Sequence, residues 1–503
     1  MTPLHPVEIE LKLVLPPDQA ALFLKLMARR RSVPVQQNLV TRYYDTPDFA
    51  LSTQGIALRV RKVGRRWLQT LKTEGERLGG LSRCAEYEMA IPGGKPDWSR
   101  FPAAAQALVS ATLRTQLIPV FETHFTRTAW LVGGRGKAQI EVALDVGEVR
   151  AGKSSQPICE IELELKAGKP DALFALAQGW AGQLDYLPLD VSKAERGVKL
   201  ARGEAEVPMK SAPLTLRDNM RVEEGFAAIM QSCLAQFQFN LPGVLASDDV
   251  EYVHQARVAL RRLRAALHLV RLACVLPEAL LERLNLMAAA LGPARDWDVL
   301  CCITLPAIAP HFADKDAWLA GLSVLETRRA EVRAEMRSEI LKARPGEWLL
   351  ALQRWLMQQA WRDVSESRRK VQLLSLKKWA RRKLSKGHQM ITRRAQAYKK
   401  LDPAERHALR IAIKRQRYAA EFFRDLFAVR CGARYQVVLQ ALQESLGRIN
   451  DLRVANRLLT RTGAGVGSIG EFVRGWLTGC QACADTKNVK KQMKSFIKRV
   501  SCW

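Results

Sequence analysis

The chain has 503 residues, 48% of them hydrophobic, and its 79 lysines and arginines outnumber its 50 aspartates and glutamates. This length exceeds one ordinary core, so we expect at least two domains. The net charge of +29 predicts a polyanionic partner, which is nucleic acid, an anionic membrane or polyphosphate. No apolar run reaches the roughly 18 residues of a transmembrane helix, so no membrane partner of that kind is expected.

The first charged strand is predicted near the start of the chain. Along Val7–Leu13, apolar residues alternate with Glu8, Glu10 and Lys12. Successive side chains of a strand point to opposite faces, so the three charged groups share one face. Alone, such a stretch is typical of a half-exposed strand whose charged face lies in water. A helix is expected next, at residues 16–31.

The same alternation returns as far as residue 166. Strands with charge on one parity are predicted at residues 42–47, 57–63, 67–72, 85–90, 122–131, 139–145 and 158–166. Burying such a face dry would cost on the order of a few kcal/mol for each unpaired charge. The sheet therefore lies flat in water or closes into a barrel with a wet, charged lumen, and closure also removes its edges. Such a lumen suits a phosphate ligand, because carboxylates bind Mg²⁺ or Mn²⁺ and basic side chains bind phosphate oxygens.

Glu8-Ile9-Glu10-Leu11-Lys12 resembles the ExExK signature of the CYTH domain, the family of triphosphate tunnel metalloenzymes, and the likeness covers about residues 5–202. The other positions that carry it are Arg59, Arg61, Lys72, Arg127, Asp145, Cys159–Lys166 and Ser192–Gly197. The resemblance implies an eight-stranded antiparallel tunnel that hydrolyses triphosphate-containing substrates with a divalent cation. The family also includes adenylate cyclases and thiamine triphosphatases, which sequence spacing does not separate.

The resemblance also implies roles for single residues. The expected catalytic and phosphate-binding residues are Glu8, Glu10, Lys12, Arg59, Arg61, Lys72, Arg127 and Lys193. The expected ligands of Mg²⁺ or Mn²⁺ are Glu8, Glu10, Asp145, Glu160, Glu162 and Glu164. The sequence does not decide which of the last three bind the ion. For Glu86 and Glu88, an ion pair with a tunnel arginine is as good an interpretation as a metal role.

From about Leu214 the alternation gives way to helical periodicity. Residues 253–264 place histidine and arginines on one stripe of a helix, beside an apolar stripe. Residues 406–418 repeat this spacing with an offset of 153 residues, and Leu446–Asp451 echoes Leu291–Asp296. One charged stripe is normally a solvated helix face, but a second copy favours two related helical bundles that each present a basic stripe.

The doubled pattern resembles the CHAD domain, a histidine-containing α-helical domain that binds inorganic polyphosphate, over about residues 214–500. The polyphosphate-binding residues that it implies are His254, Arg257, Arg261, Arg262, Arg264, His407, Arg410, Lys414, Arg415 and Arg417. Arginine can pair bidentately with phosphate oxygens. Asp296 and Asp451 are expected to orient these arginines.

These observations predict an α+β protein of two domains. We expect an eight-stranded antiparallel β-tunnel with helices at residues 1–203, a linker at 204–213 and an all-α domain at 214–503. The two repeats of the all-α domain are expected at about 214–375 and 376–503.

The expected function is metal-dependent hydrolysis of tripolyphosphate to pyrophosphate and phosphate, with polyphosphate bound by the helical domain. The alternative is a polyphosphate-granule-binding protein whose tunnel is inactive or slow. A nucleic-acid binder is a third reading, disfavoured because the basic stripes carry few aromatic residues for base stacking. Ten cysteines without a disulfide rhythm predict free thiols and a cytoplasmic protein, with granules as a second location.

Overall fold

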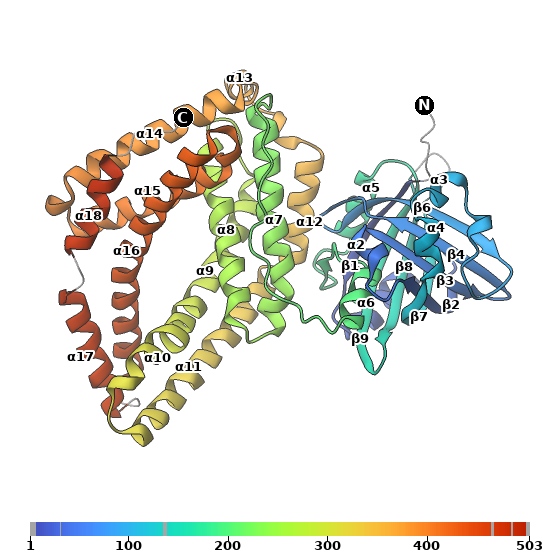
Figure 1. The fold of residues 1–503 in the computed structure, drawn as a ribbon, viewed down its shortest axis with the longest axis horizontal. Coiled ribbons are helices and arrows are strands. Elements are labelled where there is room, and N and C mark those ends of the chain that lie inside the picture. The colour runs from blue at the N-terminus through green and yellow to red at the C-terminus, as the bar shows by residue number, and fades with distance from the viewer. Residues whose placement is uncertain (1–6, 31, 134–137, 464–466, 484–485, 499–502) are drawn as a thin grey trace. The chain divides into compact units, whose positions relative to one another are not determined.

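The computed structural model describes residues 7–30, 32–133, 138–463, 467–483, 486–498 and 503. The chain forms two compact units (Figure 1). The first comprises residues 1–207 together with 344–358, and the second comprises residues 208–343 together with 359–503. The short segment 344–358 belongs to the first unit although it lies far along the chain. The expected domain boundaries placed this segment in the helical domain.

The first unit is built on a closed antiparallel β-barrel. Among the described residues, eight strands follow one another around it, and the last pairs again with the first. In ring order they are β1 (Val7–Val14), β9 (Ser154–Ala167), β8 (Gln139–Ala151), β7 (Ile118–Val132), β2 (Val35–Asp45), β3 (Ile56–Val63), β4 (Arg66–Thr73) and β6 (Leu81–Ile91). Two short strands, β5 (Glu76–Leu78) and β10 (Leu187–Pro188), extend the sheet. The predicted eight-stranded barrel is confirmed.

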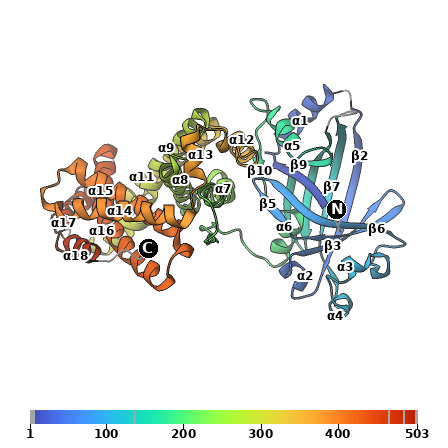
Figure 2. The same ribbon diagram turned by 90° about the horizontal axis from the view of Figure 1, so that it is seen from above.

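The alternating pattern of β1 explains how the barrel wall is stabilised. Leu11 and Leu13 are fully buried in an apolar core with Phe23 and Phe174. These phenylalanines belong to α1 (Gln19–Ala28) and α5 (Asp171–Gln178), which therefore cover the outside of this wall. In Figure 2 these two helices lie on one side of the barrel, and α2, α3 and α4 lie on the other. The opposite parity of β1, which carries the charges, is left for the lumen.

The remaining helical segments of this unit are short except for two. They are α2 (Ala50–Thr53), η1 (Trp98–Arg100), α3 (Ala103–Gln106), α4 (Ala111–Thr115), α6 (Lys193–Ala201) and α12 (Pro345–Met357).

Helix α12 is part of the core of the first unit. Leu350 is fully buried within the apolar cluster beneath α1 and α5. Arg354 donates two hydrogen bonds to the carboxylate of Asp171, each 2.7 Å long. At Gly346 a Cβ atom would lie 1.7 Å from the carbonyl oxygen of Tyr186, so only glycine fits this approach. The barrel unit thus depends on a helix supplied from within the later part of the sequence.

Leu350→Ala is expected to destabilise the first unit by about 2–5 kcal/mol, because it removes a fully buried side chain from a packed core. Hydrogen exchange in β9 and α5 should accelerate, as read by mass spectrometry of the corresponding peptides. Leu341→Ala is the matched control, because Leu341 is 52% exposed. Equal protection in both variants would contradict an integral role for α12.

The second unit is entirely helical in its described part. Its helices are α7 (Val222–Ala246), α8 (Val250–Val270), α9 (Glu278–Val299), η2 (Leu300–Thr304), α10 (Leu305–Ile308), η3 (Ala309–His311), α11 (Lys315–Lys342), η4 (Ala360–Arg362), α13 (Glu366–Gln372), α14 (Leu376–Gln396), η5 (Tyr398–Lys400), α15 (Pro403–Phe422), η6 (Arg424–Leu426), α16 (Val429–Thr462), α17 (Gly467–Cys483) and α18 (Thr486–Ile497). The two repeated motifs lie on α8 and α15, and these helices pack against each other.

Two further findings concern membrane-spanning helices and cysteine pairing. Within the described ranges, no helix combines the length and apolar character needed to cross a bilayer. Cys431 is disulfide-bonded, so the expectation of free thiols is wrong at this position. Sequence spacing could not reveal this bond, because the fold decides which thiols meet.

Candidate functional site

The charged parity of the strands lines the barrel lumen in cross-strand pairs. Lys12 on β1 lies opposite Glu162 on β9. Arg127 on β7 lies opposite Asp145 on β8, which in turn lies opposite Glu160. Neighbouring strands therefore bring residues that are far apart in sequence onto one charged surface.

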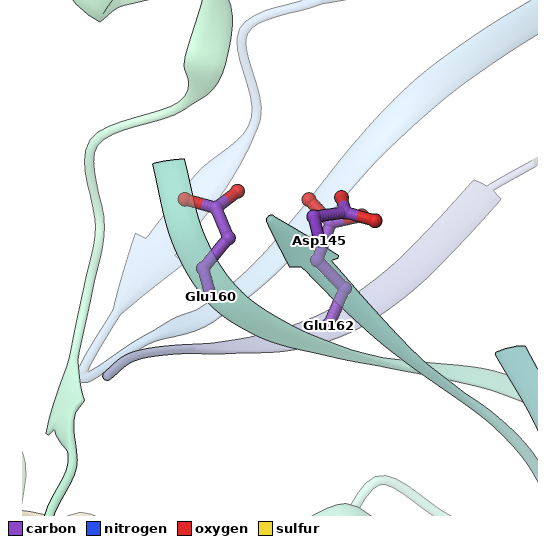
Figure 3. A group of neighbouring side chains, drawn as sticks. All are labelled: Asp145, Glu160 and Glu162. Carbon is purple, nitrogen blue, oxygen red and sulfur yellow. The ribbon is translucent and has the colours of Figure 1, made fainter. Parts of the chain in front are cut away.

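Three lumen carboxylates form a compact group that we call the paired acidic cluster: Asp145, Glu160 and Glu162 (Figure 3). One oxygen from each lies within 4.8 Å of the others. Lys193 lies among them, and its Nζ donates to Asp145 at 2.6 Å and to Glu162 at 2.8 Å. A capping box formed by Ser192 with the residue at the third helical position fixes the start of α6 and thereby places Lys193.

Other cations complete the neutralisation of this cluster. Arg127 donates to both oxygens of Asp145, at 2.8 and 2.7 Å. Lys12 lies 3.4 Å from Glu162, and Arg196 pairs with Glu160. Burial alone would raise the pKa of Glu162, but Lys193, followed by Arg127, outweighs it and holds that pKa well below its usual range. Four basic side chains therefore already balance the three carboxylates.

The role of Arg196 was missed by the sequence reasoning. Its guanidinium is 9% exposed and bonds Glu160 from the helix that also carries Lys193. The sequence does contain a signal for this role. Lys193 and Arg196 are three residues apart, and residues with this spacing face the same side of a helix.

A second group of lumen carboxylates, Glu8, Glu10 and Glu164, shares its cations with other acidic groups, because Lys72 also pairs with Glu86 and Lys12 also pairs with Glu162. We call it the open acidic group. Glu10 lies directly opposite Glu164, and Glu8 is on the same face of β1. Burial raises the pKa of Glu8 although Lys72 pairs with it. Burial also raises the pKa of Glu164, where repulsion from Glu8 adds to burial and Lys166 at 2.6 Å only partly offsets it. A divalent cation would relieve this negative charge.

The wall formed by β3 and β4 is cationic. Arg59 donates to Glu86 at 3.2 Å, and Arg61 donates to Glu88 at 2.7 Å. The Nε atoms of both arginines are buried without a hydrogen-bond partner among the described residues. Burial lowers the pKa of Arg61, and the charge of Arg59 adds to that effect. Glu86 and Glu88 thus hold the arginines in ion pairs, and the arginines keep unused donors that suit an anion.

Basic side chains also gather within the second unit, on α8, α9 and α15. We call this group the first basic cluster; its members are His254, Arg257, Arg261, Arg295, Arg410 and Lys414. Burial, followed by repulsion from Arg295, lowers the pKa of His254 to about 4. The Nε atoms of Arg261 and Arg410 are buried without partners among the described residues. Asp296 and Asp451 offset part of the mutual repulsion, but the cations outnumber these carboxylates, so the cluster is a candidate polyanion site.

Comparison with known proteins agrees with this geometry. The CYTH domain family matches residues 7–198, and the CHAD domain family matches residues 228–460. The crystal structure of the CHAD domain from the plant Ricinus communis is 30% identical, covers 59% of this chain and 99% of that chain, and superposes with a TM-score of 0.52. The chain is a CYTH domain followed by a CHAD domain.

The CYTH domain has a curated relative in Haemophilus influenzae that is named inorganic triphosphatase. The two are 36% identical over 200 residues, which is 38% of this chain and 54% of the relative. The match therefore spans about half the length of that relative. A solved Hippeastrum protein, reported to have a dominant triphosphatase activity, is 17% identical over 40% of this chain and 97% of its own, with a TM-score of 0.30. CYTH domains are generally metal-dependent, and the tunnel of this one holds acidic groups.

In the CHAD domain, the structure does not bring all the expected ligands together. Arg262 is 1% exposed and lies between helices, where it donates to Gln236 at 2.9 Å and pairs with Glu421 at 3.1 Å. It cannot reach a ligand at the first basic cluster, because it lies about 100° around α8 from Arg261. We therefore drop Arg262 from the candidate ligands.

The other outliers remain at the surface or in ion pairs. Arg417 donates to Gln443 at 2.8 Å, and Arg264 donates to Asn285 at 2.7 Å. His407 is exposed near the start of α15, and Arg415 is exposed beside the end of α8. Arg295 was missed, although it immediately precedes Asp296 in the repeated motif.

The pH dependence of polyanion binding should report on Lys414. Burial, followed by the charges of Arg410 and Arg261, lowers the pKa of Lys414 to about 7. A bound polyanion raises this pKa again, so binding takes up a proton above about pH 7 and none below it. We expect the affinity for polyphosphate to fall between about pH 7 and 9, by up to about tenfold per pH unit for one proton.

Lys414→Arg should flatten this decline, because arginine stays charged throughout the range. Titration of the full chain with long-chain polyphosphate at several pH values gives the slope. An unchanged slope in Lys414→Arg would assign the proton to another group.

Proposed function

We propose that the CYTH tunnel hydrolyses inorganic triphosphate to pyrophosphate and phosphate with Mg²⁺ or Mn²⁺, and that the CHAD domain binds inorganic polyphosphate. The observation that carries the proposal is a lumen with two complementary walls. One wall has arginines with unused donors at Arg59 and Arg61. The other has the open acidic group, in which Glu10 lies opposite Glu164 and burial raises the pKa of Glu8 and of Glu164.

The cationic wall is suited to hold the triphosphate chain. Guanidinium groups bind phosphate oxygens through pairs of parallel hydrogen bonds, which fix the orientation of the chain. Glu86 and Glu88 hold Arg59 and Arg61 in ion pairs, so little reorganisation of the arginines is needed when substrate enters. Lys72, 3.2 Å from Glu86, extends the wall toward β1.

The carboxylates differ in how well they fit a divalent ion. The paired acidic cluster already holds Lys193, which an ion would have to displace at the cost of breaking buried ion pairs. The open acidic group offers carboxylate oxygens, the preferred ligands of Mg²⁺ and Mn²⁺, and two of the lysines that pair with it are shared with other carboxylates. We therefore assign the ion to Glu8, Glu10 and Glu164. When bound, it neutralises charge on the phosphate oxygens.

The remaining residues position the reactants. Lys12 pairs with Glu10 and Glu162, and Arg127 pairs with Asp145 and Glu162, so each can contact a phosphate oxygen once substrate displaces a carboxylate partner. Hydrolysis of a phosphoanhydride needs mainly orientation and charge neutralisation, and an attacking water in line with the leaving pyrophosphate. The lumen carboxylates, lysines and arginines supply the charge neutralisation and the orientation.

Polyphosphate binding by the CHAD domain rests on the first basic cluster. Its cations repel one another in the free protein, and a flexible chain of phosphates would relieve that repulsion. The same chemistry also attracts nucleic acid. The test is competition on the full chain: long-chain polyphosphate should displace DNA of equal total charge, and the reverse order would favour a nucleic-acid partner.

Release of phosphate from tripolyphosphate, ATP, thiamine triphosphate and long-chain polyphosphate, each with Mg²⁺ or Mn²⁺, tests the enzymatic proposal. We expect tripolyphosphate to be the best substrate. Preference for ATP or thiamine triphosphate would move the assignment to another triphosphate. Polyphosphate binding without release from any substrate would favour the granule-binding alternative.

A further inference from the structure

A second group of basic side chains lies at the other end of α8. We call it the second basic cluster; its members are His268, Arg271, Lys383 and Arg415. Nη1 of Arg271 lies 2.8 Å from Nε2 of His268, and Nη1 of Arg415 lies 3.4 Å from the same atom. One imidazole nitrogen thus faces two guanidinium groups, although its single lone pair can accept only one hydrogen bond.

The internal repeat shows what this cluster lacks. With the 153-residue offset, Arg262 of α8 corresponds to Arg415 of α15, and His268 corresponds to Glu421. Arg262 pairs with Glu421 at 3.1 Å, which closes the first of two equivalent contacts between the helices. In the second contact, Arg415 meets His268 where its counterpart meets a carboxylate. The position of the missing negative charge is therefore defined by the fold itself.

Among the described residues, the charged neighbours of His268 do not supply that charge. The pKa of His268 is lowered to about 4 by burial and by the charged neighbours Arg415, Arg271 and Lys383, all of which are cations. Burial lowers the pKa of Lys383, and the positive charges of Arg271, Lys386 and Arg382 lower it further. An ionised ligand at this point would gain charge-assisted hydrogen bonds from several donors at once.

Both basic clusters include residues of α8 and α15. His254 of the first and His268 of the second lie four turns apart on α8, or roughly 20 Å along its axis. We propose that the second basic cluster binds phosphate groups of a polyphosphate chain whose other segment lies at the first basic cluster. This inference rests on the proposed polyphosphate binding and adds chain-length selection, because only a long chain bridges both clusters.

The decisive variant is His268→Glu. It places a carboxylate opposite Arg415, as Glu421 lies opposite Arg262 in the first contact. The internal carboxylate should neutralise Arg415 and exclude the ligand while keeping the helix contact. We expect the affinity for long-chain polyphosphate to fall about tenfold or more, as expected when charge-assisted contacts are lost. Affinity for tripolyphosphate should stay unchanged. Lys383→Ala, on a different helix, should act in the same direction.

The measurement is equilibrium titration of the full chain carrying Arg59→Ala, which weakens the tunnel as a competing site. Lys342→Ala is the control for loss of one positive charge, because this lysine is 69% exposed on α11. Equal losses for tripolyphosphate and long chains would overturn bridging and leave an independent anion site. Unchanged long-chain affinity in both cluster variants would overturn the inference altogether. If the parent chain binds no polyphosphate, the proposed function itself fails.

Discussion

Arg59→Ala should lower the rate of phosphate release from tripolyphosphate about 100- to 1000-fold, the order expected when one preorganised donor to a charged reacting group is removed. Arg59 is the best candidate because its Nε is buried and unused while Nη2 is fixed by Glu86. Glu86 keeps Lys72 as a partner in the variant, so the barrel should still fold.

Initial rates at saturating metal measure this effect. Arg59→Lys should recover part of the activity, because it restores charge but not the planar pair of donors. Arg66→Ala is the matched control, since Arg66 begins β4 at an exposed position. Wild-type rates in Arg59→Ala would show that the cationic wall does not bind the substrate.

Glu164→Gln should raise the metal concentration needed for half-maximal activity by about 10–100-fold or more, in line with changes at and around metal ligands. The reason is that Glu164 lies opposite Glu10 in the open acidic group, to which we assign the ion, and repulsion from Glu8 adds to burial in raising the pKa of Glu164. Excess metal should restore part of the rate. The stability of this variant should change little, because the Glu164 side chain is 28% exposed and its ion pair with Lys166, 2.6 Å long, involves a side chain that is itself 38% exposed.

Glu162→Gln is the contrasting variant on the same strand and face. It leaves Lys193, Arg127 and Lys12 with fewer partners inside the barrel, so we expect a loss of stability of about 3 kcal/mol. Metal titrations and denaturant unfolding separate the two variants. A shifted metal requirement in Glu162→Gln, with none in Glu164→Gln, would move the ion to the paired acidic cluster.

The barrel was predictable because charge alternates with apolar residues in strand after strand, and this period fixes which face is buried. The sequence could not show which of Glu160, Glu162 and Glu164 would bind the ion, because all three share one parity of the strand. This choice depends on Lys193 reaching across from α6 and on the register that sets Glu164 opposite Glu10. The expectation that Arg262 binds polyphosphate beside Arg261 had a similar weakness. Two successive residues of a helix point about 100° apart, so they do not face the same ligand.

Helix α12 was beyond prediction on other grounds. Its periodicity is that of any amphipathic helix in this half of the chain. The sequence of the helix does not indicate which element packs over Leu350. Only the packing around Gly346 and the bond between Arg354 and Asp171 assign it to the barrel.

Phosphorus NMR of tripolyphosphate incubated with the full-length chain tests the central claim most directly. With Mg²⁺ or Mn²⁺ present, the account predicts that tripolyphosphate disappears while pyrophosphate and phosphate rise in equal amounts, and that a chelator stops the reaction. Tripolyphosphate that remains intact with either metal, in a protein that still binds it, would contradict the account and make the tunnel a binding site only.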